Sequence, residues 1–255
     1  MSDQDDERHR FSEGGGFGEP YDGFDLDPPE LAVDPTKVDP VDSRVLADLL
    51  DEHNVDRDDI DAADLLEVGL GYVQINRFEQ ATEAFERVAR FADDDRLAQE
   101  AWVNKGVAHA ELEEYDEAIG AHREAIAIDP ESEHAASAET NLAYALWEFG
   151  DTSAALEHAE RAVEIDERFP QAWYNRAFFL QERGLAEEAL FCIDNAIRLG
   201  MREAAVLEEK TRILEELGEY DEAEEVAEQA NELRERAEER LVDEYEERDG
   251  TRVFE

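Results

Sequence analysis

Apolar residues recur along most of this chain at the three- and four-residue spacing of amphipathic α-helices. Between residues 62 and 237, segments with this spacing alternate with short turn signals, and a small residue takes the same place in each segment. The segment 99–132 shows the unit most completely. We expect each unit to form two antiparallel helices, because glycine and alanine let two backbones approach while larger apolar residues fill the space beside them. The pattern predicts an all-α fold.

The unit occurs five times along the chain. The five windows are 62–95, 99–132, 136–169, 170–203 and 204–237. Three extra residues separate the first window from the second, and three more separate the second from the third, and we expect them in loops between helices. Gly150, Gly184 and Gly218 occupy the predicted turn within their windows, where a helix C-cap with positive φ suits glycine. Asn76 takes that place in the first window and is the next most favourable residue for it.

The segments on either side of the repeats have different patterns. Residues 1–40 contain Gly, Pro or Asp every few positions, which predicts a disordered acidic tail. Its scattered aromatic residues leave a second interpretation open, a short motif that docks on a partner or on the chain's own groove. Residues 41–61 carry an apolar stripe from Val45 onwards, which predicts an N-terminal capping helix and linker. Residues 238–255 continue the last apolar stripe and predict a C-terminal helical extension and tail.

The unit at 99–132 resembles the tetratricopeptide repeat (TPR), whose pattern is W-x2-L-G-x2-Y, then A-x3-F, then P, over 34 residues. The landmarks that carry this resemblance are Trp102, Gly106, Tyr115, Ala118, Ala125 and Pro130. Lys105 departs from the usual leucine, and His109 and His122 stand where Tyr and Phe are common. The resemblance implies a TPR-type α-solenoid, a right-handed superhelix of antiparallel helix pairs. It also implies a role in protein–protein interaction.

Charge limits the classes of partner. The chain has 71 acidic and 24 basic residues, of which only three are lysine, and its formal net charge is -47. Acidic residues are spread over nearly every segment, which favours adaptation to a salt-rich cytoplasm, as in a halophilic archaeon, over an acidic block aimed at a basic partner. We expect no direct nucleic-acid binding, because phosphate contacts need Lys/Arg patches.

The remaining sequence features argue against catalysis. The chain contains no Walker motif, G-x-S-x-G, HExxH or CxxC, so we expect no enzymatic activity, no cofactor and no metal. His109 and His122 are expected to be core histidines with satisfied hydrogen bonds, and Cys192 a small buried residue. No apolar signal core and no apolar run of membrane-spanning length occur, so we expect a soluble cytoplasmic protein without membrane contact.

The candidate site follows from the resemblance. In the TPR family the concave face is built mainly from positions 2, 5, 6, 9, 12 and 13 of the first helix of each repeat. Asparagine occupies the sixth position in three successive windows, aromatic residues occupy positions 5, 9 and 12 of the third and fourth windows, and the fourth window is the least acidic. The resulting candidate peptide-binding residues are Asn104, Asn141, Tyr144, Trp147, Tyr174, Asn175 and Phe178. The alternative is that these asparagines follow the family consensus and the aromatic residues pack between helices.

One known ligand class of the family is not expected. TPR domains that hold the C-terminal carboxylate of chaperones use a clamp of Lys, Asn and Arg, but the equivalent places here hold Leu66, Glu67, Val103, Val107, Thr140 and Tyr174. Among the equivalent places of the five windows, only that of Arg212 in the fifth window holds a basic residue. The sequence therefore predicts a non-enzymatic adaptor that binds a protein segment in its concave groove. A structural subunit that uses its convex face or termini, and a regulatory partner of a separate enzyme, are the alternatives.

Overall fold

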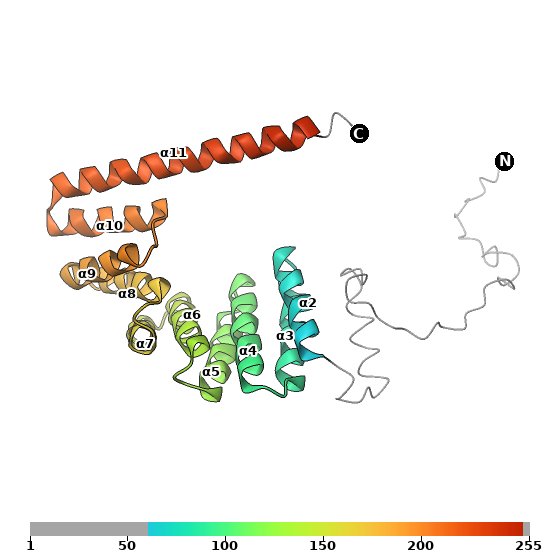
Figure 1. The fold of residues 1–255 in the computed structure, drawn as a ribbon. Coiled ribbons are helices and arrows are strands. Elements are labelled where there is room, and N and C mark those ends of the chain that lie inside the picture. Colours follow the sequence, from blue (N-terminus) through green and yellow to red (C-terminus); the bar gives the residue numbers. More distant parts are fainter. Residues whose placement is uncertain (1–60, 252–255) are drawn as a thin grey trace, which may run out of the picture. The chain divides into compact units, whose positions relative to one another are not determined.

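The computed structural model describes residues 61–251, with side chains described up to Leu241. The helices in chain order are α2 (Ala62–Gln74), α3 (Phe78–Phe91), α4 (Asp95–Glu111), α5 (Tyr115–Ile128), α6 (Glu133–Phe149), α7 (Thr152–Ile165), α8 (Pro170–Glu182), α9 (Ala186–Arg198), α10 (Ala204–Leu217) and α11 (Tyr220–Thr251) (Figure 1). The predicted acidic tail, 1–40, and the predicted capping helix, 41–61, lie outside the described residues apart from Asp61.

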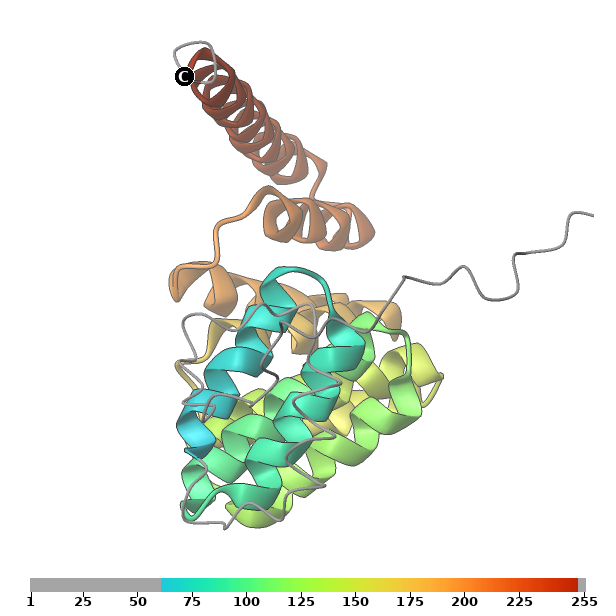
Figure 2. The ribbon, with the colours of Figure 1, turned by 90° about the vertical axis from the view of Figure 1, so that its right-hand side faces the viewer.

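The helices form successive pairs, α2–α3, α4–α5, α6–α7, α8–α9 and α10–α11 (Figures 1 and 2). The two helices of a pair pack together, and the second helix of each pair also packs on the first helix of the next pair. First helices contact one another across successive pairs, from α2 to α10. Each second helix contacts the next pair mainly through that pair's first helix, as α3 contacts α4 and α5 contacts α6. We call the face formed by α2, α4, α6, α8 and α10 the concave face.

Side-chain caps fix where several helices begin. The carboxylates of Asp61 and Asp94 accept hydrogen bonds from backbone N–H groups at the starts of α2 and α4, at 2.9 and 3.0 Å, and the Ser132 hydroxyl does so for α6 at 3.0 Å. These caps satisfy backbone donors that have no partner within the helix. They also correct one expectation. The three extra residues before 99–132 and before 136–169 do not lie in loops, because Asp94 and Ser132 start the helices earlier and the residues extend α4 and α6 by nearly a turn.

The turn between the two helices of each pair uses one residue in the left-handed region. The expectation for the glycines is confirmed, since Gly150, Gly184 and Gly218 have φ of 98°, 71° and 80°. Asn76 also fulfils its expected role, with φ of 56°. The second pair differs, because Glu113 takes this place with φ of 60°. A residue with a Cβ atom is disfavoured in this conformation, and glutamate lacks the local hydrogen bonds that help asparagine adopt it.

Glu113→Gly is therefore expected to stabilise the protein. Relief of the left-handed backbone should raise the free energy of unfolding by about 1 kcal/mol, the usual cost of that conformation for a residue with a Cβ. Urea unfolding in concentrated KCl measures the change. Gly150→Ala is the matched reciprocal variant and should lower the free energy by a similar amount, because a Cβ there meets no neighbouring atom within 4 Å and only the backbone is affected. An Ala variant as stable as wild type would refute this reading of the turns.

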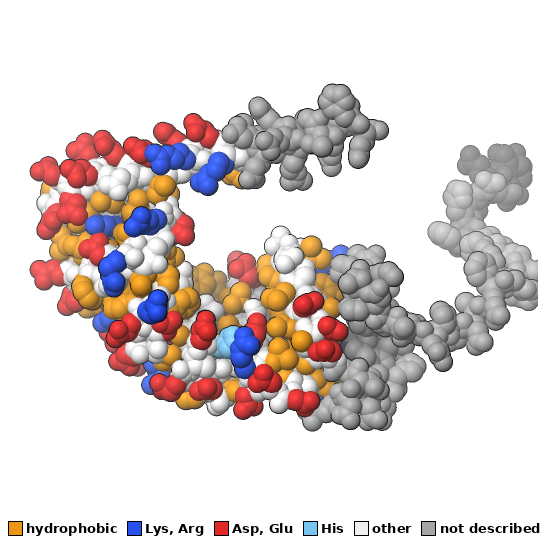
Figure 3. Space-filling view, viewed as in Figure 1, with side chains coloured by type: hydrophobic (Ala, Val, Ile, Leu, Met, Phe, Trp, Pro, Cys, Tyr) orange, Lys and Arg blue, Asp and Glu red, His pale blue; other side chains and the backbone are white. Residues whose placement is uncertain are grey.

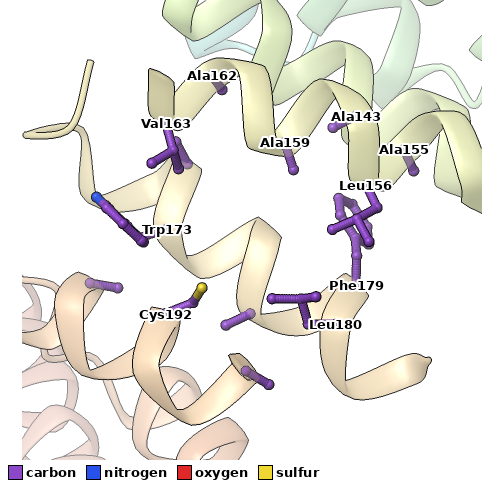
Figure 4. Close-up of a cluster of buried hydrophobic side chains, with 14 of the residues drawn as sticks. Ala143, Ala155, Leu156, Ala159, Ala162, Val163, Trp173, Phe179, Leu180 and Cys192 are labelled. Atoms are coloured by element: carbon purple, nitrogen blue, oxygen red, sulfur yellow. The ribbon is translucent and has the colours of Figure 1, made fainter. Parts of the chain in front are cut away.

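The largest buried cluster runs from the second helix pair to the fifth, from Ala118 on α5 to Ile213 on α10. Small side chains on α6 and α7, such as Ala143 and Ala159, and larger side chains on α8, such as Trp173 and Phe179, belong to this cluster (Figure 4). Cys192 of α9 is 1% exposed and belongs to the same cluster, as expected from the sequence. Burial raises the pKa of its thiol to about 11. The thiol is therefore protonated at neutral pH.

The first and second helix pairs place different buried rings beside the equivalent glycine of their first helix. In the first pair Phe85 is fully buried beside Gly69, where an added Cβ would lie 2.5 Å from the ring. In the second pair His122 is fully buried beside Gly106, where an added Cβ would lie 2.4 Å from the ring. Neither ring nitrogen of His122 has a hydrogen-bond partner in the described part of the chain. The expectation of a satisfied core histidine is therefore wrong for His122.

Ion pairs recur at the junctions between helix pairs. Each joins an exposed carboxylate on the second helix of one pair to a largely buried basic side chain on the first helix of the next. The three pairs are Glu86–Lys105 at 2.9 Å, Glu160–Arg176 at 3.4 Å and Asp194–Lys210 at 2.9 Å. Two of the three lysines in the chain thus lie at junctions within a strongly acidic molecule.

Candidate functional site

The three asparagines of the candidate site have different surroundings. Asn104 donates to the carbonyl of Glu100 in its own helix at 2.9 Å. Asn175 donates to the carbonyl of Thr140 on α6 at 3.2 Å and accepts from Gln171 at 3.0 Å. Asn141 makes no side-chain hydrogen bond within the described residues and is half-buried. The amide of Asn175 therefore links α8 to α6 and is not free for a bound segment, contrary to the expectation that it binds a peptide.

The aromatic residues of the candidate site also differ, because some pack between helices and one is exposed. Trp147 stacks on Phe179, with ring centroids 5.3 Å apart, and meets Phe178 edge-to-face at 5.2 Å. These contacts bring α6 and α8 together, so Trp147 stabilises the stack of helix pairs. Tyr174 and Phe178 are half-buried at the edge of the core. Tyr144 is 45% exposed, whereas Trp147 on the same helix is partly buried.

The structure thus narrows the candidate residues to a smaller group. Asn141 and Tyr144 lie one helical turn apart on α6, and Tyr174 and Phe178 lie one turn apart on the adjacent α8. We call these four residues the α6–α8 patch. An amide without an internal partner can donate to and accept from the backbone of an extended segment, and the rings can contact apolar side chains.

An acidic feature beside this patch was missed in the sequence. The last turn of the first helix carries an exposed glutamate in each of four successive pairs, Glu111, Glu148, Glu182 and Glu216, which we call the glutamate rim. None of the four forms an ion pair within residues 61–241. The signal was present at the repeat spacing, but glutamate is so frequent in this chain that it did not stand out.

Two tyrosines lie within the electrostatic influence of this rim. Removal from water and then the negative charge of Glu148 raise the pKa of Tyr144, with a further contribution from Glu111. Removal from water raises the pKa of Tyr115, and Glu148 again contributes the next largest effect. Both hydroxyls are therefore neutral at physiological pH, and the negative potential at this end of α6 is available to a positively charged ligand.

The other buried charges have internal partners. Glu139 of α6 is 1% exposed and lies 2.5 Å from Nδ1 of His158 and 3.1 Å from Nε of Arg161, both on α7. Glu209, the equivalent of the three asparagines in the fifth pair, is fully buried and contacts Arg212. No group of histidine, cysteine and carboxylate side chains that could hold a metal ion occurs among the described residues. The contacts of Glu139 join α6 to α7, whereas Glu209 and Arg212 both lie on α10.

Acidic side chains are frequent on the visible face of the described residues (Figure 3). Asp and Glu side chains occur over the visible described helices, with hydrophobic side chains between them (Figure 3). None of the helices in residues 61–251 has the length and apolar character that a membrane crossing requires.

Comparisons with known families agree with this architecture. A family model described as Tetratricopeptide repeat matches residues 97–168, which span the second and third helix pairs. A second model with the same description matches residues 210–236 in the last pair. The chain therefore contains TPR repeats, and its fold is an all-α TPR solenoid, as the sequence predicted. No curated protein matches the chain.

Solved structures show the same fold at low sequence identity. MamA is 20% identical, with a TM-score of 0.55, and the match covers 67% of this chain and 96% of that one. MamA 41-end from Desulfovibrio magneticus RS-1 is 17% identical, with a TM-score of 0.56, covering 71% and 96%. YrrB, described as a TPR protein with an unusual peptide-binding site, is 19% identical, with a TM-score of 0.52, covering 73% and 91%. At these identities the likeness concerns the fold.

Proposed function

We propose that this chain is a non-enzymatic protein-interaction scaffold that binds a peptide segment of a partner protein on its concave face. The TPR fold supports this proposal, and the description of YrrB shows that a chain of similar fold carries a peptide-binding site. We place the site at the α6–α8 patch. We further propose that the protein acts in a salt-rich cytoplasm, as in a halophilic archaeon, because its acidic residues are spread over the whole sequence.

One observation carries the choice of site. Tyr144 is 45% exposed on α6 and lies one turn from Asn141, whose amide has no internal partner in the described residues. The amides of Asn104 and Asn175 are already used in the fold. An unused amide beside an exposed aromatic ring supplies both the polar and the apolar contacts that an extended segment needs.

A second candidate function rests on a different surface. Phe191 of α9 is 62% exposed, and its ring lies 5.9 Å from that of Trp173. An exposed aromatic residue on a second helix is suited to a structural subunit that contacts its partner through the opposite face. The two functions therefore make opposite predictions for Tyr144 and Phe191.

The combined variant Asn141→Ala and Tyr144→Ala should weaken partner binding by about thirtyfold, the loss of about 2 kcal/mol that is typical when a central aromatic anchor is truncated. The measurement is capture of partners by the tagged protein from extracts of its own cells in concentrated KCl, quantified by mass spectrometry. The matched control is Phe191→Ala, which removes a similarly exposed aromatic residue from the other face. Partners lost with Phe191→Ala and retained with the double variant would replace the groove function by the structural one.

A further inference from the structure

The glutamate rim distinguishes the end of the concave face that lies beside the α6–α8 patch. Carboxylates at the junctions between pairs, such as Glu86 and Asp194, are engaged by lysines. The four rim glutamates are exposed and have no such partner within the described side chains. An unpaired carboxylate row costs electrostatic repulsion that a bound cation would relieve.

The rim and the patch meet at the C-terminal end of α6. Tyr144 and Glu148 are one turn apart on the same exposed side of this helix, and both Glu148 and Glu111 act electrostatically on the Tyr144 hydroxyl. An aromatic ring next to carboxylates suits arginine, whose planar guanidinium stacks on a ring while its N–H groups donate to a carboxylate. The C-terminal ends of α4 and α6 also carry the negative ends of their helix dipoles, which adds to the attraction for a cation.

We propose that the segment bound by the α6–α8 patch is a cationic apolar peptide. Its arginine or lysine side chains contact Glu111 and Glu148, and its apolar side chains contact Tyr144 and Phe178. This inference rests on the proposed function and adds the chemical class of the partner to it.

Charge decides against two other occupants. Residues 1–40 of the chain itself contain twelve acidic and three basic residues, so the rim would repel this segment. A nucleic acid would be repelled by the same carboxylates, since phosphate contacts require positive groups. A basic segment of another protein remains the occupant that the electrostatics favour.

Synthetic peptides test this inference with the intact chain. One set keeps a fixed pattern of leucine and phenylalanine and carries arginine, glutamine or glutamate at all other positions. Binding is measured by fluorescence anisotropy in about 1 M KCl, where the Debye length is about 3 Å and only close charge contacts contribute. The variants are Glu111→Gln with Glu148→Gln on the rim, and Glu157→Gln with Glu164→Gln on α7 as a control of equal charge change.

Wild type should bind the arginine peptide at least about tenfold more tightly than the glutamine peptide, which corresponds to one close charge pair. The rim variant should lose that preference and the α7 control should keep it. Equal affinity for the two peptides, an equal effect of the α7 control, or no binding of any peptide would overturn the inference.

The same peptides, measured on wild type and on the variant Asn141→Ala with Tyr144→Ala, distinguish a wrong ligand class from a wrong binding site. One outcome would retain the groove as the binding site and reject the cationic ligand. In it, the variant Asn141→Ala with Tyr144→Ala binds no peptide, while wild type binds the arginine and glutamine peptides with equal affinity. Unchanged binding in that double variant would remove the α6–α8 patch itself from the proposal and the inference with it.

Discussion

Transfer from concentrated to dilute KCl is expected to unfold the protein. The net charge is -47, and the exposed carboxylates repel one another over a Debye length of about 10 Å in about 0.1 M salt but only about 3 Å in about 1 M salt. We expect helical circular dichroism to be lost below a few tenths molar KCl and recovered at molar KCl. Thermal melting across the same concentrations measures the size of the effect.

A charge-reduced variant tests whether repulsion is the cause. Glu224, Glu225 and Glu228 are exposed neighbours on α11, and their replacement by glutamine should lower the KCl concentration needed for folding. Replacing Gln229 by asparagine on the same exposed helix changes no charge and should leave the salt requirement unchanged. Equal melting temperatures of wild type in dilute and molar KCl would contradict adaptation to high salt.

His122→Phe is expected to stabilise the protein and to make it less sensitive to acid. Burial, with a smaller contribution from the charge of His109, lowers the pKa of His122 to about 4 from an ordinary value of 6.5. Its neutral form also leaves two ring nitrogens without partners in the described residues, which costs about 1–3 kcal/mol. Phe85 beside Gly69 shows that phenylalanine fits the equivalent place in the first pair.

The sign of the pH effect follows from the lowered pKa. The unfolded chain binds a proton at His122 below pH 6.5 while the folded chain does not until about pH 4, so the folded state loses stability as pH falls between these values. The advantage of His122→Phe over wild type should therefore grow by about 2 kcal/mol between neutral pH and about pH 5. Comparing the two proteins at each pH cancels the titration of the many shared carboxylates.

The reciprocal variant Phe85→His provides the control for His122. It should destabilise the first pair and add a second loss of stability as pH falls below 6.5, because it places a buried histidine beside Gly69 as His122 lies beside Gly106. Urea unfolding in molar KCl measures both variants without changing the ionic strength. An advantage of His122→Phe that is the same at neutral pH and about pH 5 would show that His122 titrates normally in the folded protein.

The sequence was sufficient for features that depend on local chemistry. The all-α fold followed from apolar periodicity and from small residues at repeated positions, and the solenoid followed from the resemblance to the TPR family. The left-handed turns at Gly150, Gly184 and Gly218 followed because the required backbone angle selects glycine. The early starts of α4 and α6 are also encoded locally, because Asp94 and Ser132 cap these helices ahead of the 34-residue windows.

Features that depend on stacking between repeats could not be read from the chain. Asn175 and Asn141 occupy the same repeat position, yet only Asn175 donates to a carbonyl on the neighbouring first helix. The aromatic side chains Trp147 and Tyr144 are three residues apart on α6, yet one stacks on Phe179 and the other is exposed. These differences arise from how α8 packs on α6, which is set by contacts among residues distant in the sequence.

The central claim is that a partner segment lies on the α6–α8 patch, and photo-crosslinking tests it most directly. Benzoylphenylalanine in place of Tyr144, or in place of Phe191 as the matched position on α9, is irradiated in cells that make the protein from its own gene. We expect a partner to be linked through position 144, at a segment rich in arginine or lysine and apolar residues, and none to be linked through position 191. A partner linked through position 191 and absent from position 144 would contradict it.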